Sequence, residues 1–247
     1  MIIGNGLERI RKALIDCSQS FNSADLFPTV IPEAAAFVVS DPYAFAIATC
    51  LDRGTKADII WTIPYDIQQF LGHLDPHRIY QKSLEELADL FAHLPRRPRY
   101  VNDAPRTLKE LTRIVVEECG GDASNIWKGK RASEVKRTFL SIHGVGIGIA
   151  SMAVLLIEAA FSIRFDDLDR QQMDIKPDVH TIRVLYRLGV SQVMTEQAAV
   201  EAARRLNPEY PGAVDGPLWN IGRTWCHALA PRCSECCMET VCAKRLN

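Results

Sequence analysis

The sequence predicts an all-α fold, and three observations carry that prediction. Apolar residues recur at helical spacing, as at Leu7, Ile10 and Leu14. Helix-start signals precede several such apolar stretches. No segment alternates apolar and polar residues clearly enough to predict a β-strand.

The helix-start signals are local and specific. Asp41 followed by Pro42 is typical of an N-cap with proline at the first helical position, and it predicts an apolar helix through about Leu51. Residues 18–32, rich in Ser, Asn and Pro, are predicted to form a loop. Two capping boxes precede further apolar repeats: Ser83-x-x-Glu86 and Thr107-x-x-Glu110.

Length and composition indicate an ordinary globular protein. The chain has 247 residues, 47% of them hydrophobic, which suffices for one large domain or two small ones. The start of the chain, residues 1–5, shows no basic region followed by an apolar one, and the longest apolar segment, Ile147 to Ile157, is too short to cross a bilayer. We therefore expect a cytoplasmic protein without membrane contact, whose eight cysteines are ligands or buried thiols and not crosslinks.

Charge gives no global signal for nucleic-acid binding, because the net charge is -1. It is unevenly placed, however. Two basic clusters stand out: Arg96, Arg97 and Arg99, and then Lys128, Lys130, Arg131, Lys136 and Arg137. Each cluster is compatible with phosphate contacts and equally with an ordinary solvated surface.

Four cysteines near the end of the chain have the spacing of a metal loop. Cys226, Cys233, Cys236 and Cys242 form the pattern C-x6-C-x2-C-x5-C, with Cys237 left over. Thiolates are soft ligands that suit zinc or iron-sulfur clusters. Structural zinc sites mostly use two Cys-x-x-Cys pairs, whereas this stretch has one, which favours a cluster. A zinc loop is the alternative; disulfides are disfavoured because no signal for secretion is present.

A glycine-rich turn precedes the most apolar helix, predicted over residues 150–160. Gly144 and Gly146, one residue apart, let the backbone turn tightly and approach another backbone. Backbone N–H groups at such a turn, next to a helix N-terminus, can bind an anion such as a phosphate. An ordinary helix–helix turn is the alternative.

The segment Lys176-Pro177-Asp178 predicts the start of a helix, with Asp178 near its N-terminus. A carboxylate there can cap the helix, which contributes about 1 kcal/mol. Capping alone is a sufficient reason for an aspartate at this position.

The cysteine spacing, with Gly222-Arg223 before it and Pro231-Arg232 inside it, resembles the 4Fe-4S loop of the endonuclease III family of DNA glycosylases. The glycine turn is similar to the helix-hairpin-helix of the same superfamily, which grips the DNA backbone, and both motifs stand in the family's order. The resemblance implies a 4Fe-4S cluster as cofactor and double-stranded DNA as partner. The DNA-binding residues that it implies are Gly144, Val145, Gly146 and Gly148.

The resemblance also implies an architecture. It predicts a six-helix barrel lobe over residues 40–165, with the helix-hairpin-helix at about 134–160, and a terminal lobe from residues 1–39 and 166–247 that carries the cluster. The polar stretch 164–176 is predicted to cross between the lobes, with the active site in the cleft. We expect a monomer associated with the nucleoid.

The segment that begins at Asp178 resembles the part of the family that carries the catalytic aspartate, and His180 and Arg183 match its flanking positions. An ionised carboxylate near C1′ stabilises an oxocarbenium-like sugar and activates the attacking water. The target nucleotide must first be flipped out of the duplex. The resemblance thus implies a base-excision glycosylase with Asp178 as its catalytic residue.

The sequence departs from the family at several positions. Bifunctional members carry a nucleophilic lysine where this chain has Gly148, and a glycine cannot form an imine, so we expect hydrolysis without strand cleavage. The glutamine that such enzymes insert into the helix aligns with Gly54. The neighbouring Asp52 and Arg53 are candidates to line the pocket or to meet the orphaned base, and a surface turn between helices is the alternative. Thr49 stands where the adenine-removing branch has glutamate.

Two alternative functions are compatible with the sequence. One is a DNA-binding protein that kept the iron-sulfur scaffold and lost catalysis, which the missing lysine and glutamine allow. The other is a zinc-bearing helical enzyme unrelated to DNA. The presence of Asp178 favours the glycosylase.

Overall fold

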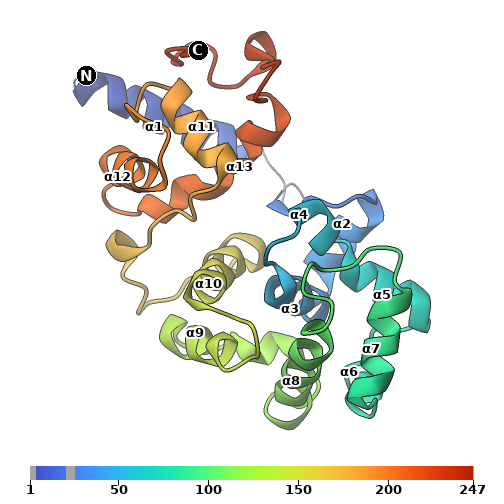
Figure 1. The fold of residues 1–247 in the computed structure, drawn as a ribbon. Helices are drawn as coiled ribbons and strands as arrows, with labels where there is room; N and C mark the ends of the chain where they lie inside the picture. Colours follow the sequence, from blue (N-terminus) through green and yellow to red (C-terminus); the bar gives the residue numbers. More distant parts are fainter. Residues whose placement is uncertain (1–3, 21–25, 247) are drawn as a thin grey trace. The chain divides into compact units, whose positions relative to one another are not determined.

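A computed structural model describes residues 4–20 and 26–246, and every regular element within these ranges is helical (Figure 1). The all-α prediction is confirmed. The α-helices are α1 (Gly4–Gln19), α2 (Pro32–Ser40), α3 (Pro42–Leu51), α4 (Ala57–Ile60), α5 (Ile63–Leu71), α6 (Pro76–Tyr80), α7 (Leu84–His93), α8 (Ala104–Glu117), α9 (Ala132–Leu140), α10 (Ile147–Phe161), α11 (Val179–Arg187), α12 (Glu196–Leu206) and α13 (Asp215–Thr224).

Within the described residues, short 3-10 helices lie between these elements at Ala123–Ile126, Arg170–Gln172 and Pro211–Val214, and another follows α13 at Cys233–Glu235. Among the described residues, no single helix is long and apolar enough to span a membrane; α2 and α3 reach that length only together, and they are bent by 111°.

The contacts divide the chain into two compact units, Ser23–Leu168 and Met1–Asn22 with Asp169–Asn247. The chain passes from one unit to the other at residues 168 and 169, inside the polar stretch 164–176. α2 lies before the predicted lobe boundary at residue 40, yet it packs against α3 and α5 of the larger unit. The predicted roles of the two lobes stay predictions.

The larger unit is built around α3. Asp41 caps this helix by accepting hydrogen bonds from the N–H groups of the second and third helical residues, and Pro42 opens it, as predicted. Every residue from Tyr43 to Leu51 is buried. Phe45 packs edge-on against the rings of Trp127 and Phe161, at centroid distances of 5.6 and 5.1 Å. Truncating such a core aromatic to alanine costs about 3–5 kcal/mol.

One of the two predicted capping boxes is confirmed and the other is wrong. Ser83 and Glu86 exchange both capping bonds at the start of α7. Thr107 does not start a helix, because α8 already begins at Ala104, with a proline in its first turn. Thr107 and Glu110 lie in the interior of α8, where their side chains are free to bind another segment.

The smaller unit packs α1, α11, α12 and α13 around a separate apolar core, in which Leu14, Leu185 and Leu218 are completely covered. α1 continues to Gln19, beyond the predicted start of the loop 18–32, and residues 21–25 of that loop lie outside the described residues.

Acidic residues of the stretch 164–176 have specific structural partners. Asp167 accepts hydrogen bonds from the backbone N–H groups of Ala132 (2.7 Å) and Ser133 (3.2 Å), so it caps the start of α9. In the smaller unit, Asp174 receives both hydrogen bonds of the Arg204 guanidinium at 2.7 Å. The stretch therefore anchors a helix in each unit.

Candidate functional site

The turn between α9 and α10 favours a glycine at position 144. Gly144 has φ of +80°, a conformation that residues with a side chain rarely adopt. A Cβ atom there would also lie 1.9 Å from Nη1 of Arg53, far below van der Waals contact, so the guanidinium would have to move. Glycine therefore permits both the backbone conformation of the turn and the close approach of Arg53.

Side chains of α8, and Arg53 just after α3, bind the inner edge of this turn, which is the side that faces the rest of the larger unit. The N–H of His143 donates to Oε2 of Glu110 at 2.6 Å, and the carbonyl of His143 accepts from Thr107 at 2.9 Å. Nη1 of Arg53 donates to the carbonyl of Gly144 at 3.2 Å. Three polar groups of the turn thus have partners inside the larger unit, which leaves the outer edge for a ligand.

The outer edge is the N-terminus of α10. Gly146 is the N-cap with an extended backbone, and the first intrahelical hydrogen bond runs from Ala150 to its carbonyl at 3.0 Å. The N–H groups of residues 147–149 come before that bond and find no acceptor within the helix. Gly146 and Gly148 are exposed, with open space where a Cβ would stand. An anion can therefore approach these N–H groups directly.

The four predicted DNA-binding residues differ in their environments. Gly146 and Gly148 lie on the exposed outer edge, and Gly144 is half-buried beneath Arg53. Val145 is buried, and its N–H donates to the carbonyl of Ile142 at 3.1 Å. The side chain of Val145 therefore packs into the core of the larger unit, whereas the two exposed glycines leave their backbone open to the solvent.

The two residues predicted to line a pocket lie directly after α3. Asp52 is the C-cap of α3, and its N–H donates to the carbonyl of Thr49 at 3.2 Å. Arg53 reaches the hairpin and also lies 3.8 Å from a carboxylate oxygen of Asp103. Arg53 therefore acts as a support for the turn, and a pocket role for either residue stays a prediction.

Three residues of the two basic clusters are engaged in ion pairs. Arg96 pairs with the buried carboxylate of Asp66 through two hydrogen bonds. In the second cluster, Lys128 lies 3.6 Å from Asp122 and Arg131 lies 3.5 Å from Asp167. These pairs favour the interpretation of those three residues as structural.

Asp178 caps α11 as the sequence predicts. Its Oδ1 atom accepts hydrogen bonds from the N–H groups of His180 and Thr181, both at 2.8 Å, and the hydroxyl of Thr181 accepts from the N–H of Asp178 in return at 2.9 Å. Both capping bonds end on the same oxygen. Capping therefore occupies one carboxylate oxygen and is compatible with chemistry at the other.

A second carboxylate, Asp215, lies close enough to Asp178 for the two charges to interact. It opens α13, its Oδ1 atom is buried without a hydrogen-bond partner, and the backbone of Lys176 donates to its carboxyl group. Burial raises the pKa of Asp215 to about 7 against that hydrogen bond, and the charge of Asp178 adds to the rise. The smaller unit thus places two carboxyl groups with different environments near the start of α11.

The crossing of α11 and α13 explains Gly222 and brings His180 against α13. A Cβ on Gly222 would lie 2.6 Å from the Cβ of His180, so only glycine permits this approach. Burial lowers the pKa of His180, and Nη2 of Arg183 lies 3.0 Å from its Nδ1 atom. The same guanidinium donates to the carbonyls of Gly222 (3.0 Å) and Cys226 (2.7 Å). His180 and Arg183 therefore hold the helix pair together.

The C-terminal loop places the four predicted ligands around one cavity. Cys226, Cys233, Cys236 and Cys242 all line it, together with apolar side chains of α11 and α13. Arg187 of α11 secures the loop by donating to the carbonyls of His227 at 2.7 Å and Ala228 at 2.8 Å, and its Nη1 lies 3.5 Å from Sγ of Cys226.

As they stand, no three His, Cys, Asp or Glu side chains within the described ranges converge closely enough to hold a metal ion. The four thiols nevertheless share one cavity. Burial raises the pKa of Cys236 and of Cys242, and the nearby cysteine sulfurs add to the rise. A raised pKa favours the neutral thiol, so these cysteines would need a cationic centre beside them to ionise. The four cysteines of the predicted ligand set thus line the same cavity.

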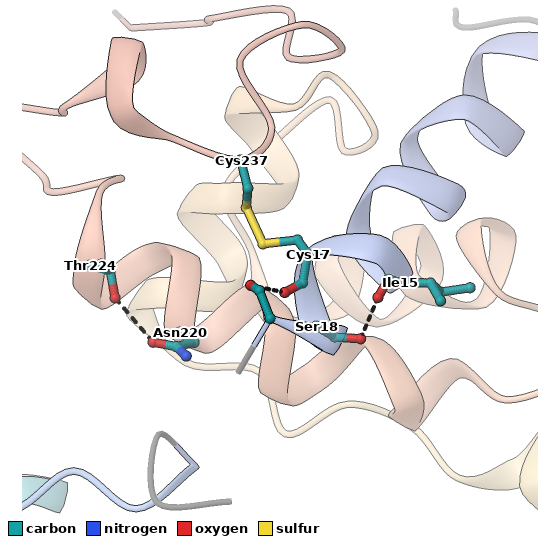
Figure 2. Close-up of a disulfide and its surroundings, with 7 residues drawn as sticks. Ile15, Cys17, Ser18, Asn220, Thr224 and Cys237 are labelled. Carbon is teal, nitrogen blue, oxygen red and sulfur yellow. Dashed lines mark hydrogen bonds between the residues drawn. A yellow bond between two sulfur atoms is a disulfide. The ribbon is translucent and has the colours of Figure 1, made fainter. Parts of the chain in front are cut away.

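Cys237 is not a spare thiol, and the expectation that the cysteines form no crosslinks is wrong for this residue. It forms a disulfide with Cys17 near the end of α1, with a Cα–Cα distance of 6.0 Å (Figure 2). The two cysteines are separated by 220 residues, so their pairing depends on the packing of both termini in the smaller unit. The bond ties the cysteine loop to α1.

Sequence reasoning missed several residues of these sites. Thr107 and Glu110 were assigned to a helix start, and Cys17, Arg187 and Asp215 carried no recognised signal. Arg187 lies four residues after Arg183 and thus on the same face of α11, which is the one periodic signal that could have indicated it.

No family model matches the chain. Endonuclease III of Thermotoga maritima is 26% identical over 204 residues, which cover 82% of this chain and 83% of that protein. A trapped covalent endonuclease III–DNA intermediate, an estranged-adenine complex, superposes with a TM-score of 0.59 at 18% identity, over 99% of this chain and 97% of the other. A thermostable thymine-DNA glycosylase gives 0.58 at 19% identity, over 97% and 96%. At such identities the two structures establish similarity of fold.

Proposed function

We propose that the chain is an endonuclease III-like protein of the helix-hairpin-helix superfamily and that it acts as a DNA base-excision glycosylase. It hydrolyses the N-glycosidic bond of a damaged or mispaired base that is flipped out of duplex DNA. The observation that carries the proposal is Asp178, whose carboxylate is fixed by two backbone N–H groups through one oxygen. The likeness to endonuclease III and to a thymine-DNA glycosylase supports it.

In the proposed reaction the bond between C1′ and the base breaks first, and the electron pair leaves with the base. The sugar then carries positive charge, which the Asp178 carboxylate stabilises. A water molecule attacks C1′ and gives its proton to that carboxylate, which acts as general base. Because the N-cap fixes one oxygen in place, the carboxylate is held for this step without reorganisation.

The α9–α10 turn is proposed to hold the DNA backbone. Its exposed N–H groups at Gly146 and Gly148 suit a phosphate, while Arg53 and Thr107 keep the turn rigid from inside. Such contacts position the duplex and carry no sequence information. The choice of base must therefore come from other groups.

We propose that the enzyme is monofunctional. A lyase of this family needs an amine nucleophile, and position 148 has none. Gly148 is exposed with open space at its Cβ position, so packing does not demand a glycine there. Gly148→Lys is thus a sharp test: we expect the variant to gain a covalent complex with DNA on borohydride treatment, which wild-type protein lacks. A wild-type protein that traps DNA equally well would contradict the proposal.

We propose a 4Fe-4S cluster at the cysteine cavity. Cys226, Cys233, Cys236 and Cys242 would hold it, and four thiolates leave no open ligand position, so it supplies a structural anchor. The apolar wall from α11 and α13 and the guanidinium of Arg187 near one sulfur suit an anionic, solvent-shielded cluster. Zinc at this cavity is the alternative, and it would leave the purified protein colourless.

The test of the proposed function is base release from duplexes that carry uracil, oxidised pyrimidines, alkylated purines or mispairs, followed by hot alkali. Asp178→Asn keeps a side-chain oxygen for the cap and removes the charge, so folding should persist. We expect base release to fall at least about 100-fold, the scale of a lost electrostatic contact in the transition state. Undiminished release by the variant would end the proposal.

A second function is favoured by two absences in the sequence: position 148 has no lysine and position 54 has no glutamine. A non-catalytic DNA-binding protein on the same scaffold fits these. It would bind the same duplexes with wild-type affinity and release none of the bases.

A further inference from the structure

The carboxyl group of Asp215 in the smaller unit is buried at a cost to stability. It opens α13, and its Oδ1 atom is buried with no hydrogen-bond partner among the described residues. A buried polar atom without a partner destabilises a protein, most of all when the atom is charged. An aspartate at this position therefore points to a role other than stability.

This carboxyl group is attached to the segment that carries Asp178. The backbone N–H of Lys176, two residues before Asp178, donates to the Asp215 carboxyl group, and Asp178 itself caps α11. α11 and α13 pack side by side, and Gly222 permits their close approach at His180 (Figure 1). Neighbouring helices of one unit therefore hold the two carboxyl groups in a fixed relation.

The two carboxyl groups also interact through their charges. Burial raises the pKa of Asp215 to about 7, and the negative charge of Asp178 adds to the rise. An interaction between two charges is mutual, so an ionised Asp215 acts on Asp178 as strongly as Asp178 acts on Asp215. The pair thus carries one negative charge in weak acid and two in weak base.

Within the described part of the smaller unit, the other charged groups around α13 keep their state near neutral pH. Burial lowers the pKa of His180 on α11, so its imidazole is neutral there. The cations are Lys176, Arg183, Arg187 and Arg223, and they stay charged. α13 also packs against the 3-10 helix Pro211–Val214, which has no charged residue, and against α1. On α1, Glu8 and Arg11 pair with each other, and Arg9, Lys12 and Asp16 are exposed.

We propose that Asp215 is a positioning residue for base release, which anchors the segment of Asp178 and, when ionised, makes the Asp178 carboxylate more reactive. The inference rests on the proposed function and adds a second carboxyl group to its site. Two negative charges in a partly buried site repel each other, and positive charge that develops on the sugar relieves this repulsion. An ionised Asp215 therefore favours the transition state over the ground state through Asp178, without contacting the substrate.

The first experiment measures the single-turnover rate of base release from a duplex as a function of pH. We expect the wild-type rate to rise about 5- to 10-fold between about pH 6 and about pH 8, with a midpoint near 7. Asp215→Asn resembles the neutral carboxyl group, so it should match wild type at the acidic end and lack the rise. Asp16→Asn, which changes an exposed carboxylate of α1, should keep the wild-type profile. An Asp215→Asn protein that keeps the rise would overturn the inference.

The anchoring role is tested by comparing Asp215→Ala with Asp215→Asn. Asparagine keeps an acceptor for the N–H of Lys176, whereas alanine removes it. We expect Asp215→Ala to release base about 10- to 100-fold more slowly than Asp215→Asn at every pH, because the Asp178 segment is no longer held in place. Affinity for the duplex should be the same in both variants. Equal rates of release in the two would contradict the anchoring role.

A further experiment needs no chemistry. In protein labelled with ¹⁵N-lysine, the amide signal of Lys176 reports the protonation of the carboxyl group that accepts its hydrogen bond. The signal should titrate with a midpoint near pH 7 in wild-type protein and at lower pH in Asp178→Asn, where the neighbouring charge is gone. It should not titrate in this range in Asp215→Asn. An unchanged midpoint in Asp178→Asn would overturn the coupling of the two carboxyl groups.

The two proposals fail in distinguishable ways. If wild-type protein releases no base at any pH but the midpoint of the Lys176 signal depends on Asp178, the proposed glycosylase activity is wrong and the coupling stands. If wild-type protein releases a base and Asp215→Asn matches its rate at every pH, the inference alone is wrong.

Discussion

The hairpin of the larger unit and the cysteine loop of the smaller unit are held in place by different means. The hairpin lies between two helices, α9 and α10, and rests on side chains of α8 and on Arg53, which follows α3, a helix buried from Tyr43 to Leu51. The cysteine loop after Thr224 has one 3-10 helix of three residues as its regular structure within the described part of the chain. Its position depends on Arg183, Arg187 and the disulfide.

This difference indicates where each unit is vulnerable. Several independent contacts support the hairpin, so the loss of one should be tolerated. The cysteine loop has little regular structure of its own, and it relies on arginine side chains of α11, the disulfide, the buried side chain of Met238 and, by our proposal, a metal centre. The loop should therefore respond strongly to single changes, and variants of the two regions can be ranked by expected effect.

The largest effect is expected for Cys236→Ser. If the cysteines hold a cluster, a lost ligand removes a binding free energy on the order of 10 kcal/mol, the scale of structural metal sites. We expect loss of brown colour and of soluble protein. Cys119→Ala, which removes a buried thiol of the larger unit, serves as control and should leave the colour unchanged. A brown, soluble Cys236→Ser protein would show that the ligands are assigned wrongly.

The next effect is expected for Arg187→Met, which keeps the length of the side chain and removes its charge. The carbonyls of His227 and Ala228 lose their donors, and each unsatisfied group costs about 1–3 kcal/mol. Chemical denaturation should report a loss of roughly 3 kcal/mol. Arg205→Met, which removes one hydrogen bond to the carbonyl of Val190, should lose about 1 kcal/mol. Similar losses in both variants would contradict the special role of Arg187.

Local signals made part of this structure predictable. The caps at Asp41, Ser83 and Asp178 depend on residues two or three positions apart, so the sequence alone contains all participants. The turn at Gly144 belongs to the same class, because a positive φ is a property of one residue. The cysteine spacing also acts within a short stretch: the four cysteines line one cavity, and their role as ligands stays a prediction.

The rest depended on partners far away in the sequence. Thr107 and Glu110 look like a capping box, but their partner is His143, more than thirty residues later. Cys17 and Cys237 stand 220 positions apart. The pKa of Asp215 depends on burial at the start of α13 and on Asp178, which only the packing of α11 against α13 brings near. Pairings of this kind are consequences of tertiary structure.

A third prediction concerns pH and the buried carboxyl group of the smaller unit. The pKa of Asp215 is about 7 in the folded protein and near its ordinary value of 3.8 when unfolded, so the folded state binds more protons between these values. Stability should therefore fall as pH rises from about 4 to 7, by up to about 1.4 kcal/mol per pH unit. Asp215→Asn should flatten this slope in denaturation curves and be more stable than wild type at pH 8.

The control is Asp16→Asn, which changes an exposed carboxylate on α1 of the same unit. It should leave the pH dependence as it is in wild-type protein. An Asp215→Asn protein with the wild-type slope would show that this carboxyl group is ionised in the folded state, and that the buried Oδ1 atom has a partner in solution.

The smallest effect is expected for Thr107→Val, which tests the hairpin side of the comparison. Valine keeps the shape of threonine and removes the donor to the carbonyl of His143, so we expect a loss of about 1 kcal/mol in denaturation. The bonds from Arg53 to Gly144 and from His143 to Glu110 remain, and affinity for duplex DNA should change less than twofold, a small fraction of the loss seen when a phosphate contact is removed. If Thr107→Val destabilised the protein as much as Arg187→Met, the hairpin would depend on single contacts as the cysteine loop does.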